Sequence, residues 1–160
     1  MFMRTGNRWK RISAQQWCKA VLVFFLMHCG SLVYAIDNPD APDYVGDFLE
    51  RAGVYAHEIQ HTPHTTQGYV RIYARYEDFL NDELNSAYTR LMTVLSDEAK
   101  HALSRSQEQW FRYRDQEFEF IALNWTYANF GSASVISRGD YRTRIINDRV
   151  VLLLQYLQNF

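Results

Sequence analysis

Two histidines and a glutamate have the types and spacing of a zinc-dependent hydrolase. His57, Glu58 and His61 form the pattern H-E-x-x-H within the stretch HEIQHTPH. Residues four positions apart lie on one face of a helix, so both imidazoles could bind one Zn²⁺ while the glutamate acts as a general base. The pattern therefore raises the hypothesis of a small zinc hydrolase.

A zinc hydrolase needs more than this short pattern, which also arises by chance. It needs a third protein ligand, for which Glu77 and Glu83 are the downstream candidates. Such enzymes also usually hold an extended substrate along a sheet edge, and no segment alternates with the period of two that predicts a strand. We therefore expect no catalytic residues and no cofactor. We interpret His57 and His61 as part of a solvated helix face, with incidental metal binding by this pair as the alternative.

A second group of polar residues lies on a predicted core face. Gln107 and Arg114 occupy the same stripe as Trp110, in a segment where large apolar residues recur every three or four positions. Buried polar groups need partners. The partners that neighbouring helices offer are Asn85, Asp82 and Asp148. We favour a network that fixes the register of the helices, and the alternative is a polar pocket or a partner-binding surface on the same seam.

The first 35 residues have the organisation of a secretory signal peptide. Residues 1–19 contain five basic residues and no acid, an apolar run follows at 20–27, and small residues precede a cleavage position after Ala35. The apolar run is too short for a typical transmembrane helix. We expect cleavage after Ala35, with an uncleaved anchor or a lipoprotein attached through Cys29 as the alternatives.

Export would leave a chain from Ile36 to Phe160 without disulfides, because Cys18 and Cys29 both lie in the predicted signal peptide. In this part of the chain 12 basic residues stand against 18 acidic ones, a net charge of −6. Such a charge is a poor match for nucleic acid or an anionic membrane and suits a basic protein partner. We expect a periplasmic protein, or a secreted one, with no membrane contact beyond the signal peptide.

Hydrophobic periodicity predicts an all-α fold, an antiparallel bundle of three main helices plus one short N-terminal helix. The short helix is expected from about Tyr44 to His61, with Asp43 as N-cap and Pro63 ending it. The main helices are expected from about Tyr69 to Leu95, from Ser96 to about Trp125, and from Gly139 or Asp140 to Tyr156, with a loop at 131–134. Ile146, Val150, Leu153 and Leu157 should form the core face of the last one. The predicted organisation is a signal peptide at 1–35, an acidic tether and short helix at 36–68, and a helical domain at 69–160.

Two patterns on consecutive helices are unusual in combination. Leu84-Asn85, Tyr88 and Leu91 form L-N-x-x-Y-x-x-L, and the next helix contains L-x-x-x-Q-x-x-W-x-x-x-R-D. The residues of the second pattern are Leu103, Gln107, Trp110, Arg114 and Asp115. Together they resemble the LprI-like lysozyme-inhibitor family of small exported bacterial helical domains, and Arg149 with the leucines after it resembles the family's last helix more loosely.

The resemblance implies a non-enzymatic protein that binds lysozyme-type muramidases, with a basic lysozyme as partner and protection of the cell wall as the outcome. The candidate residues for binding, or for the seam between helices, are Asn85, Tyr88, Gln107, Trp110, Arg114 and Asp115. Family members usually have a cysteine where this chain has Phe118, and losing a disulfide typically costs about 2–5 kcal/mol, which packing of the phenylalanine can offset. The alternatives are the zinc hydrolase and an envelope scaffold or immunity-type partner protein.

Overall fold

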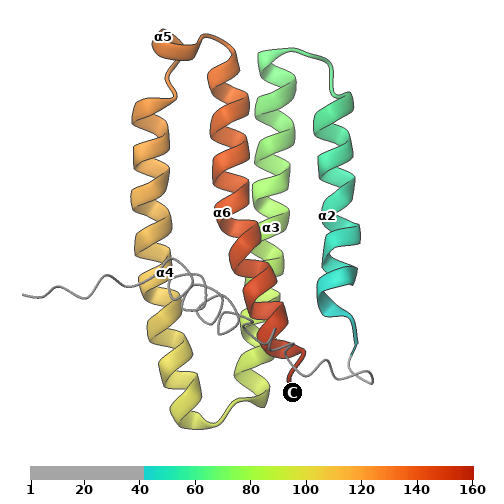
Figure 1. Ribbon diagram of the computed structural model, residues 1–160, viewed down its shortest axis with the longest axis vertical. Coiled ribbons are helices and arrows are strands. Elements are labelled where there is room, and N and C mark those ends of the chain that lie inside the picture. Colours follow the sequence, from blue (N-terminus) through green and yellow to red (C-terminus); the bar gives the residue numbers. More distant parts are fainter. Residues whose placement is uncertain (1–41) are drawn as a thin grey trace, which may run out of the picture. The chain divides into compact units, whose positions relative to one another are not determined.

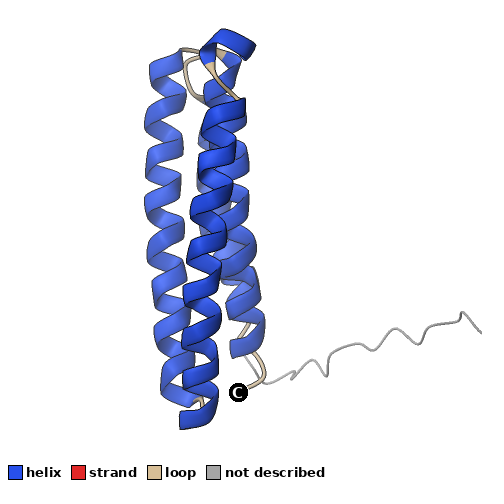
Figure 2. Ribbon diagram, turned by 90° about the vertical axis from the view of Figure 1, so that its left-hand side faces the viewer, coloured by secondary structure: helices blue, strands red, loops and turns tan. Residues whose placement is uncertain are grey.

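The computed structural model describes residues 42–160, and this part of the chain is built from helices without strands (Figures 1 and 2). The all-α prediction is confirmed. The helices are α2 (Tyr44–His61), α3 (Thr66–Val94), α4 (Asp97–Asn124), α5 (Tyr127–Phe130) and α6 (Ala133–Leu157). The predicted signal peptide at 1–35, both cysteines and nearly all of the tether at 36–42 lie outside the described residues. No helix between residues 42 and 160 is both long and apolar enough to cross a membrane.

The four long helices run alternately in opposite directions (Figure 1). α3 and α6 pack together along most of their length, α2 contacts both of them, and α4 lies against α6. Although α3 and α4 follow one another in the sequence, they make little direct contact. α3 and α4 therefore face one another along a seam, and both pack on α6.

The core lies mainly between α2, α3 and α6. Phe48 of α2 and Leu80, Leu84 and Leu91 of α3 are almost completely buried. The predicted core face of the last helix is confirmed, since Ile146, Val150, Leu153 and Leu157 are all buried. Each buried side chain of this size contributes roughly 1.5–3 kcal/mol of transfer free energy, so these three helices hold most of the apolar stabilisation.

Side-chain caps begin three of the four long helices. Asp43 Oδ1 accepts from the Gly46 amide at 2.8 Å, and Ser96 Oγ accepts from the Ala99 amide at 3.3 Å. The Asp43 cap was expected from the sequence, and Ser96 was expected as the start of its helix. Thr65 caps α3 in the same way, because its hydroxyl accepts from the Gly68 amide at 3.0 Å. α3 therefore begins at Thr66, three residues before the expected start, and the loop before it is shorter than predicted.

The last helix is also longer than predicted. α6 begins at Ala133, six residues before Gly139, so the second half of the expected loop at 131–134 is helical. The preceding single turn, α5, was not predicted. It is capped by Thr126 and ends at Gly131, whose φ of 60° lies in the region that favours glycine.

Candidate functional site

The open seam between α3 and α4 contains a surface hollow of about 350 Å³. The residues that line it are Asn85, Tyr88, Ser104, Gln107, Glu108 and Phe111. Three predicted site residues, Asn85, Tyr88 and Gln107, therefore lie around one hollow although they come from two helices. Whether they bind a partner stays a prediction.

A buried hydrogen bond lies at the base of this seam. Arg149 Nε of α6 donates to Gln107 Oε1 of α4 at 3.0 Å, and Arg149 Nη2 donates to Ser106 Oγ at 3.3 Å. Gln107 and Arg149 are both buried. Burial lowers the pKa of the Arg149 guanidinium from its ordinary value. Because these bonds join α4 to α6, they help to hold α4, whose buried residues are Gln107 and Ile121, in its register.

The polar partner of Gln107 differs from the sequence expectation. Asn85, Asp82 and Asp148 were expected as partners, but the bond is made by Arg149. The signal for Arg149 is present in the sequence: it is three residues after Ile146 and four before Leu153, on the predicted core face of the last helix. A charged residue on such a face must find a partner inside the fold.

Cationic and aromatic side chains alternate further along α4. The Arg114 guanidinium carbon lies 4.8 Å from the ring centre of Phe111 and 5.6 Å from that of Trp110. Both of its hydrogen bonds go to the neighbouring Asp115 of the same helix, at 2.7 and 3.0 Å, rather than to another helix. Trp110 is half-buried, and it packs on the core from one side. The predicted core stripe of α4 is thus only partly covered, with Ile121 and Gln107 as its buried members.

Phe118 takes part in the same layer. Its ring lies 4.4 Å from the guanidinium carbon of Arg142 on α6 and 5.8 Å from that of Arg114. Phe118 is half-buried and packs against the core cluster. The residue at the position of the family cysteine therefore joins α4 to α6 through packing and cation–π contact.

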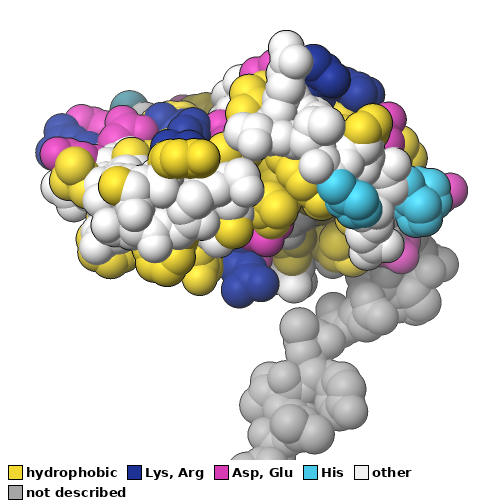
Figure 3. All heavy atoms as spheres, turned by 90° about the horizontal axis from the view of Figure 1, so that it is seen from above, with side chains coloured by type: hydrophobic (Ala, Val, Ile, Leu, Met, Phe, Trp, Pro, Cys, Tyr) yellow, Lys and Arg dark blue, Asp and Glu magenta, His cyan; other side chains and the backbone are white. Residues whose placement is uncertain are grey.

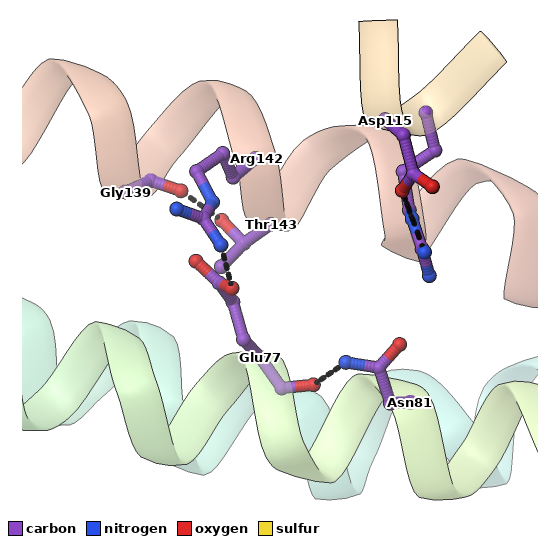
Figure 4. A network of polar contacts seen from close by, with 7 residues as sticks. Glu77, Asn81, Asp115, Gly139, Arg142 and Thr143 are labelled. Carbon is purple, nitrogen blue, oxygen red and sulfur yellow. Dashed lines mark hydrogen bonds and ion pairs between the residues drawn. The ribbon is translucent and has the colours of Figure 1, made fainter. Parts of the chain in front are cut away.

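A second hollow, of about 270 Å³, lies between α3, α4 and α6 near this layer. Glu77 of α3 borders it and accepts from Arg142 Nη2 at 2.8 Å (Figure 4). Burial raises the pKa of the Glu77 carboxyl above its ordinary value, and the Arg142 charge offsets only part of that rise. The pair ties α3 to α6 and leaves no free carboxylate at this point of the seam.

The histidine pattern lies on the exposed end of α2, beside a third hollow of about 350 Å³. The His57 and His61 rings stack with their centres 4.0 Å apart, and His61 Nδ1 lies 2.8 Å from the His57 carbonyl oxygen. Glu58, the candidate general base, accepts from Arg75 of α3 at 3.0 Å. An arginine therefore occupies the carboxylate that the hydrolase hypothesis requires.

The two candidate third ligands are also engaged by arginines. Glu83 accepts from Arg51 at 2.8 Å, just as Glu77 does from Arg142. Among residues 42–160 no three histidine, cysteine, aspartate or glutamate side chains are grouped so that they could hold a metal ion. The geometry therefore gives the zinc hydrolase hypothesis no support.

Comparison with known protein families gives a match. The family model described as "Lysozyme inhibitor LprI" matches residues 59–153, which include α3, α4, α5 and most of α6. No curated protein and no solved structure matches the chain. The match confirms the resemblance seen in the two motifs at 84–91 and 103–115, and it extends that resemblance over more than half of the chain.

Proposed function

Because the chain belongs to the LprI family of lysozyme inhibitors, we propose that it is an exported, non-enzymatic protein that binds lysozyme-type muramidases and blocks them, and so protects the cell wall. The match over residues 59–153 is the observation that carries this proposal. The predicted signal peptide at 1–35 supports export, and we propose the periplasm as the place of action.

The charge of the exported part supports a basic partner. Residues 36–160 have a net charge of −6, and Asp43, Asp47 and Glu50 are exposed at the start of α2. Opposite net charges speed diffusional encounter more than they strengthen the final complex. We therefore expect the acidic net charge of the exported part to increase the association rate with a basic lysozyme.

A non-enzymatic role is supported by the arginine partners of the three carboxylates that the hydrolase hypothesis would use. Glu58, Glu77 and Glu83 each accept a hydrogen bond from an arginine of another helix. A general base must be free to accept a proton from water or substrate. In this arrangement the three side chains link helices instead.

The test is lysis of a peptidoglycan substrate by a basic lysozyme, with the exported part of the chain added at micromolar concentration. We expect slower lysis, and no inhibition of any muramidase tested would reject the function while leaving the fold untouched. Raising the ionic strength from about 50 to 300 mM, which shortens the Debye length from roughly 14 to 6 Å, should lower the association rate. The double variant Asp43→Asn with Asp47→Asn lowers the net negative charge by two and keeps the helix cap, since asparagine also caps a helix. It should therefore lower the association rate as high salt does, and Glu98→Gln, which removes one charge, should have a smaller effect.

A further inference from the structure

The end of the molecule formed by the last turn of α4, by α5 and by the start of α6 has no charged side chain in its sequence. From Phe120 to Ser137 the chain has 18 consecutive residues without Asp, Glu, Lys, Arg or His. In the whole chain 22% of the residues are charged. A surface segment of this length without charge is thus a strong departure from the rest of the protein.

This uncharged segment gathers aromatic side chains on the surface. The ring centre of Trp125 lies 4.7 Å from that of Tyr141, 5.8 Å from that of Phe120 and 6.4 Å from that of Phe130. Leu123 and Tyr127 flank Trp125 in the sequence and are 69% and 75% exposed. We call this surface the aromatic tip, and its members are Phe120, Leu123, Trp125, Tyr127, Phe130 and Tyr141. Figure 3 looks down on this end of the molecule; hydrophobic side chains lie along its lower left edge and in the middle, charged side chains lie behind them at the upper left, and histidine side chains lie at the right.

Hydrogen bonds hold the backbone of the aromatic tip. The Thr126 hydroxyl accepts from the Asn129 amide at 3.3 Å, and Asn129 Nδ2 donates to the Asn124 carbonyl oxygen at 3.3 Å. On the other side of Gly131, Ser134 Oγ donates to the Gly131 carbonyl oxygen at 2.7 Å, and Ser134 is fully buried. Because the backbone of the tip is already fixed, binding a partner would cost this chain less conformational entropy.

The size of the aromatic tip fits a protein interface. A fully exposed side chain of this kind presents about 200 Å², so the exposed fractions of its five most accessible members correspond to on the order of 500 Å². This is near the upper end for the largest apolar patch on a monomer, roughly 300–600 Å². It is also more than half of the roughly 800 Å² that one partner contributes to a standard interface.

Resting on the proposed function, we propose that the aromatic tip is the surface that binds the muramidase, and that it occupies the cleft in which the enzyme binds its glycan substrate. Interface centres are depleted in charge and enriched in Tyr, Trp and Phe, as this surface is. The tip stands at the end of the helices (Figure 1), whereas substrate sites of enzymes are concave. Filling the cleft would explain inhibition directly, because glycan and inhibitor would exclude one another.

Charged side chains of both signs border the aromatic tip. Glu117 and Glu119 lie on α4 just before the uncharged segment, Asp115 is paired with Arg114, and Arg138 follows the segment directly on α6. When the tip is in the cleft, the exposed Glu119 would face the rim of a basic enzyme. Uncharged contacts at the centre with a polar, charged rim are the usual arrangement of a specific interface.

Binding of the exported chain to a basic lysozyme tests the proposal, measured by titration calorimetry with and without tri-N-acetylchitotriose as a cleft ligand. Leu123→Gln and Tyr127→Ser remove apolar area without changing charge, and each should weaken binding at least tenfold. The matched control is Val54→Gln on α2, where Val54 is 58% exposed, and it should bind like the parent. The trisaccharide should compete with the parent protein.

The outcomes separate the two proposals. Should the parent bind and inhibit while both tip variants bind equally well, the tip assignment is overturned and the inhibitor function stands. If the parent binds no muramidase, the function itself fails and the tip assignment fails with it. Parent binding to phosphatidylglycerol vesicles that Tyr127→Ser abolishes, without lysozyme binding, would identify the tip as a membrane contact and overturn both. Melting temperatures of the variants equal to that of the parent exclude unfolding as the cause of lost binding, and Tyr127→Ala is the second variant at that position.

Discussion

The ring of Tyr73 on α3 packs directly on the backbone of Gly139 on α6. A Cβ atom at position 139 would lie 2.2 Å from Tyr73 Cγ, so no larger residue fits without movement of the ring. The Tyr73 hydroxyl also donates to Asp140 Oδ1. Burial and the hydrogen bond to Asp140 raise the pKa of Tyr73 above its ordinary value. This contact lets α3 and α6 approach closely in the half of α6 that begins at the aromatic tip.

Gly139→Ala should lower the free energy of unfolding by about 1–3 kcal/mol, because it overpacks this contact. Gly53→Ala is the matched control, since Gly53 lies in α2 with nothing within 4 Å of its added Cβ. The control should raise stability by roughly 0.5–1 kcal/mol through lower chain entropy. Urea denaturation measures the free energy of unfolding of both variants. An increase in both would show that the Tyr73 ring moves aside without cost.

The same glycine explains where the fold could and could not be predicted from the sequence. The bounds of α2 follow from the Asp43 cap and from Pro63, which are local signals, and they agree with the structure. The last helix was expected to start at Gly139 or Asp140. The place of Gly139 inside α6 depends on Tyr73, 66 residues earlier in the chain, and local patterns do not contain that contact. α5 was missed because a single turn is too short to show periodicity.

The seam was predictable in its location and not in its pairing. Spacing identified Gln107 as polar within an apolar stripe, and the structure buries it. The side chain that reaches it depends on how α4 rotates against α6, and that rotation selects Arg149. Arg114, on the same stripe, stays at the edge and bonds to Asp115, because α4 is only partly covered. The aromatic tip was not predicted, because its signal in the sequence is a run of residues without charge and not a motif of charged or polar residues.

Gln107→Leu should destabilise the protein by about 1–3 kcal/mol, because it leaves the buried Arg149 Nε without its acceptor. The double variant Gln107→Leu with Arg149→Met removes both polar groups and should recover most of that loss. Urea titrations of the two single variants and the double variant give the coupling energy. Additive losses in the double variant would show that the two side chains do not depend on one another.

Glu77 should make stability depend on pH in the opposite direction from an ordinary ion pair. Its pKa in the folded protein is raised above the ordinary value, so the folded state takes up a proton first as the pH falls. As the pH drops through the pKa of Glu77 in the folded protein, the unfolding free energy of the parent should therefore increase relative to that of Glu77→Gln. The increase should stop once the pH falls below the pKa of Glu77 in the unfolded chain. Thermal melts of both proteins between about pH 7 and pH 4 test this, and a relative loss of parental stability in acid would show that the Arg142 pair dominates.

Chelation should leave the protein unchanged. We expect less than one zinc per chain after purification, the same melting temperature with and without EDTA, and no chelator-sensitive cleavage of casein. The reason is that residues 42–160 group no third His, Cys, Asp or Glu side chain with His57 and His61, and that Arg75 holds Glu58, the catalytic carboxylate of the hydrolase hypothesis. Stoichiometric zinc that is lost in His57→Ala, together with proteolysis that is lost in Glu58→Gln, would reverse the assignment of function.

The exported protein should begin at Ile36. Cleavage after Ala35 removes both cysteines, so the intact mass should correspond to residues 36–160 without any disulfide. Mass spectrometry of protein recovered from the envelope measures this. A mass that retains Cys29 with added lipid would instead place the protein on a membrane anchor.

The alternating directions of the helices have a practical consequence for immobilisation. α2 begins and α6 ends at the same end of the molecule, and the aromatic tip lies at the other (Figure 1). A helix rises about 1.5 Å per residue, so the 25 residues of α6 separate the two ends by roughly 37 Å. An affinity handle placed before Tyr44 or after Leu157 would orient every molecule on a sensor surface with its aromatic end outward, available to a soluble enzyme without steric hindrance from the support.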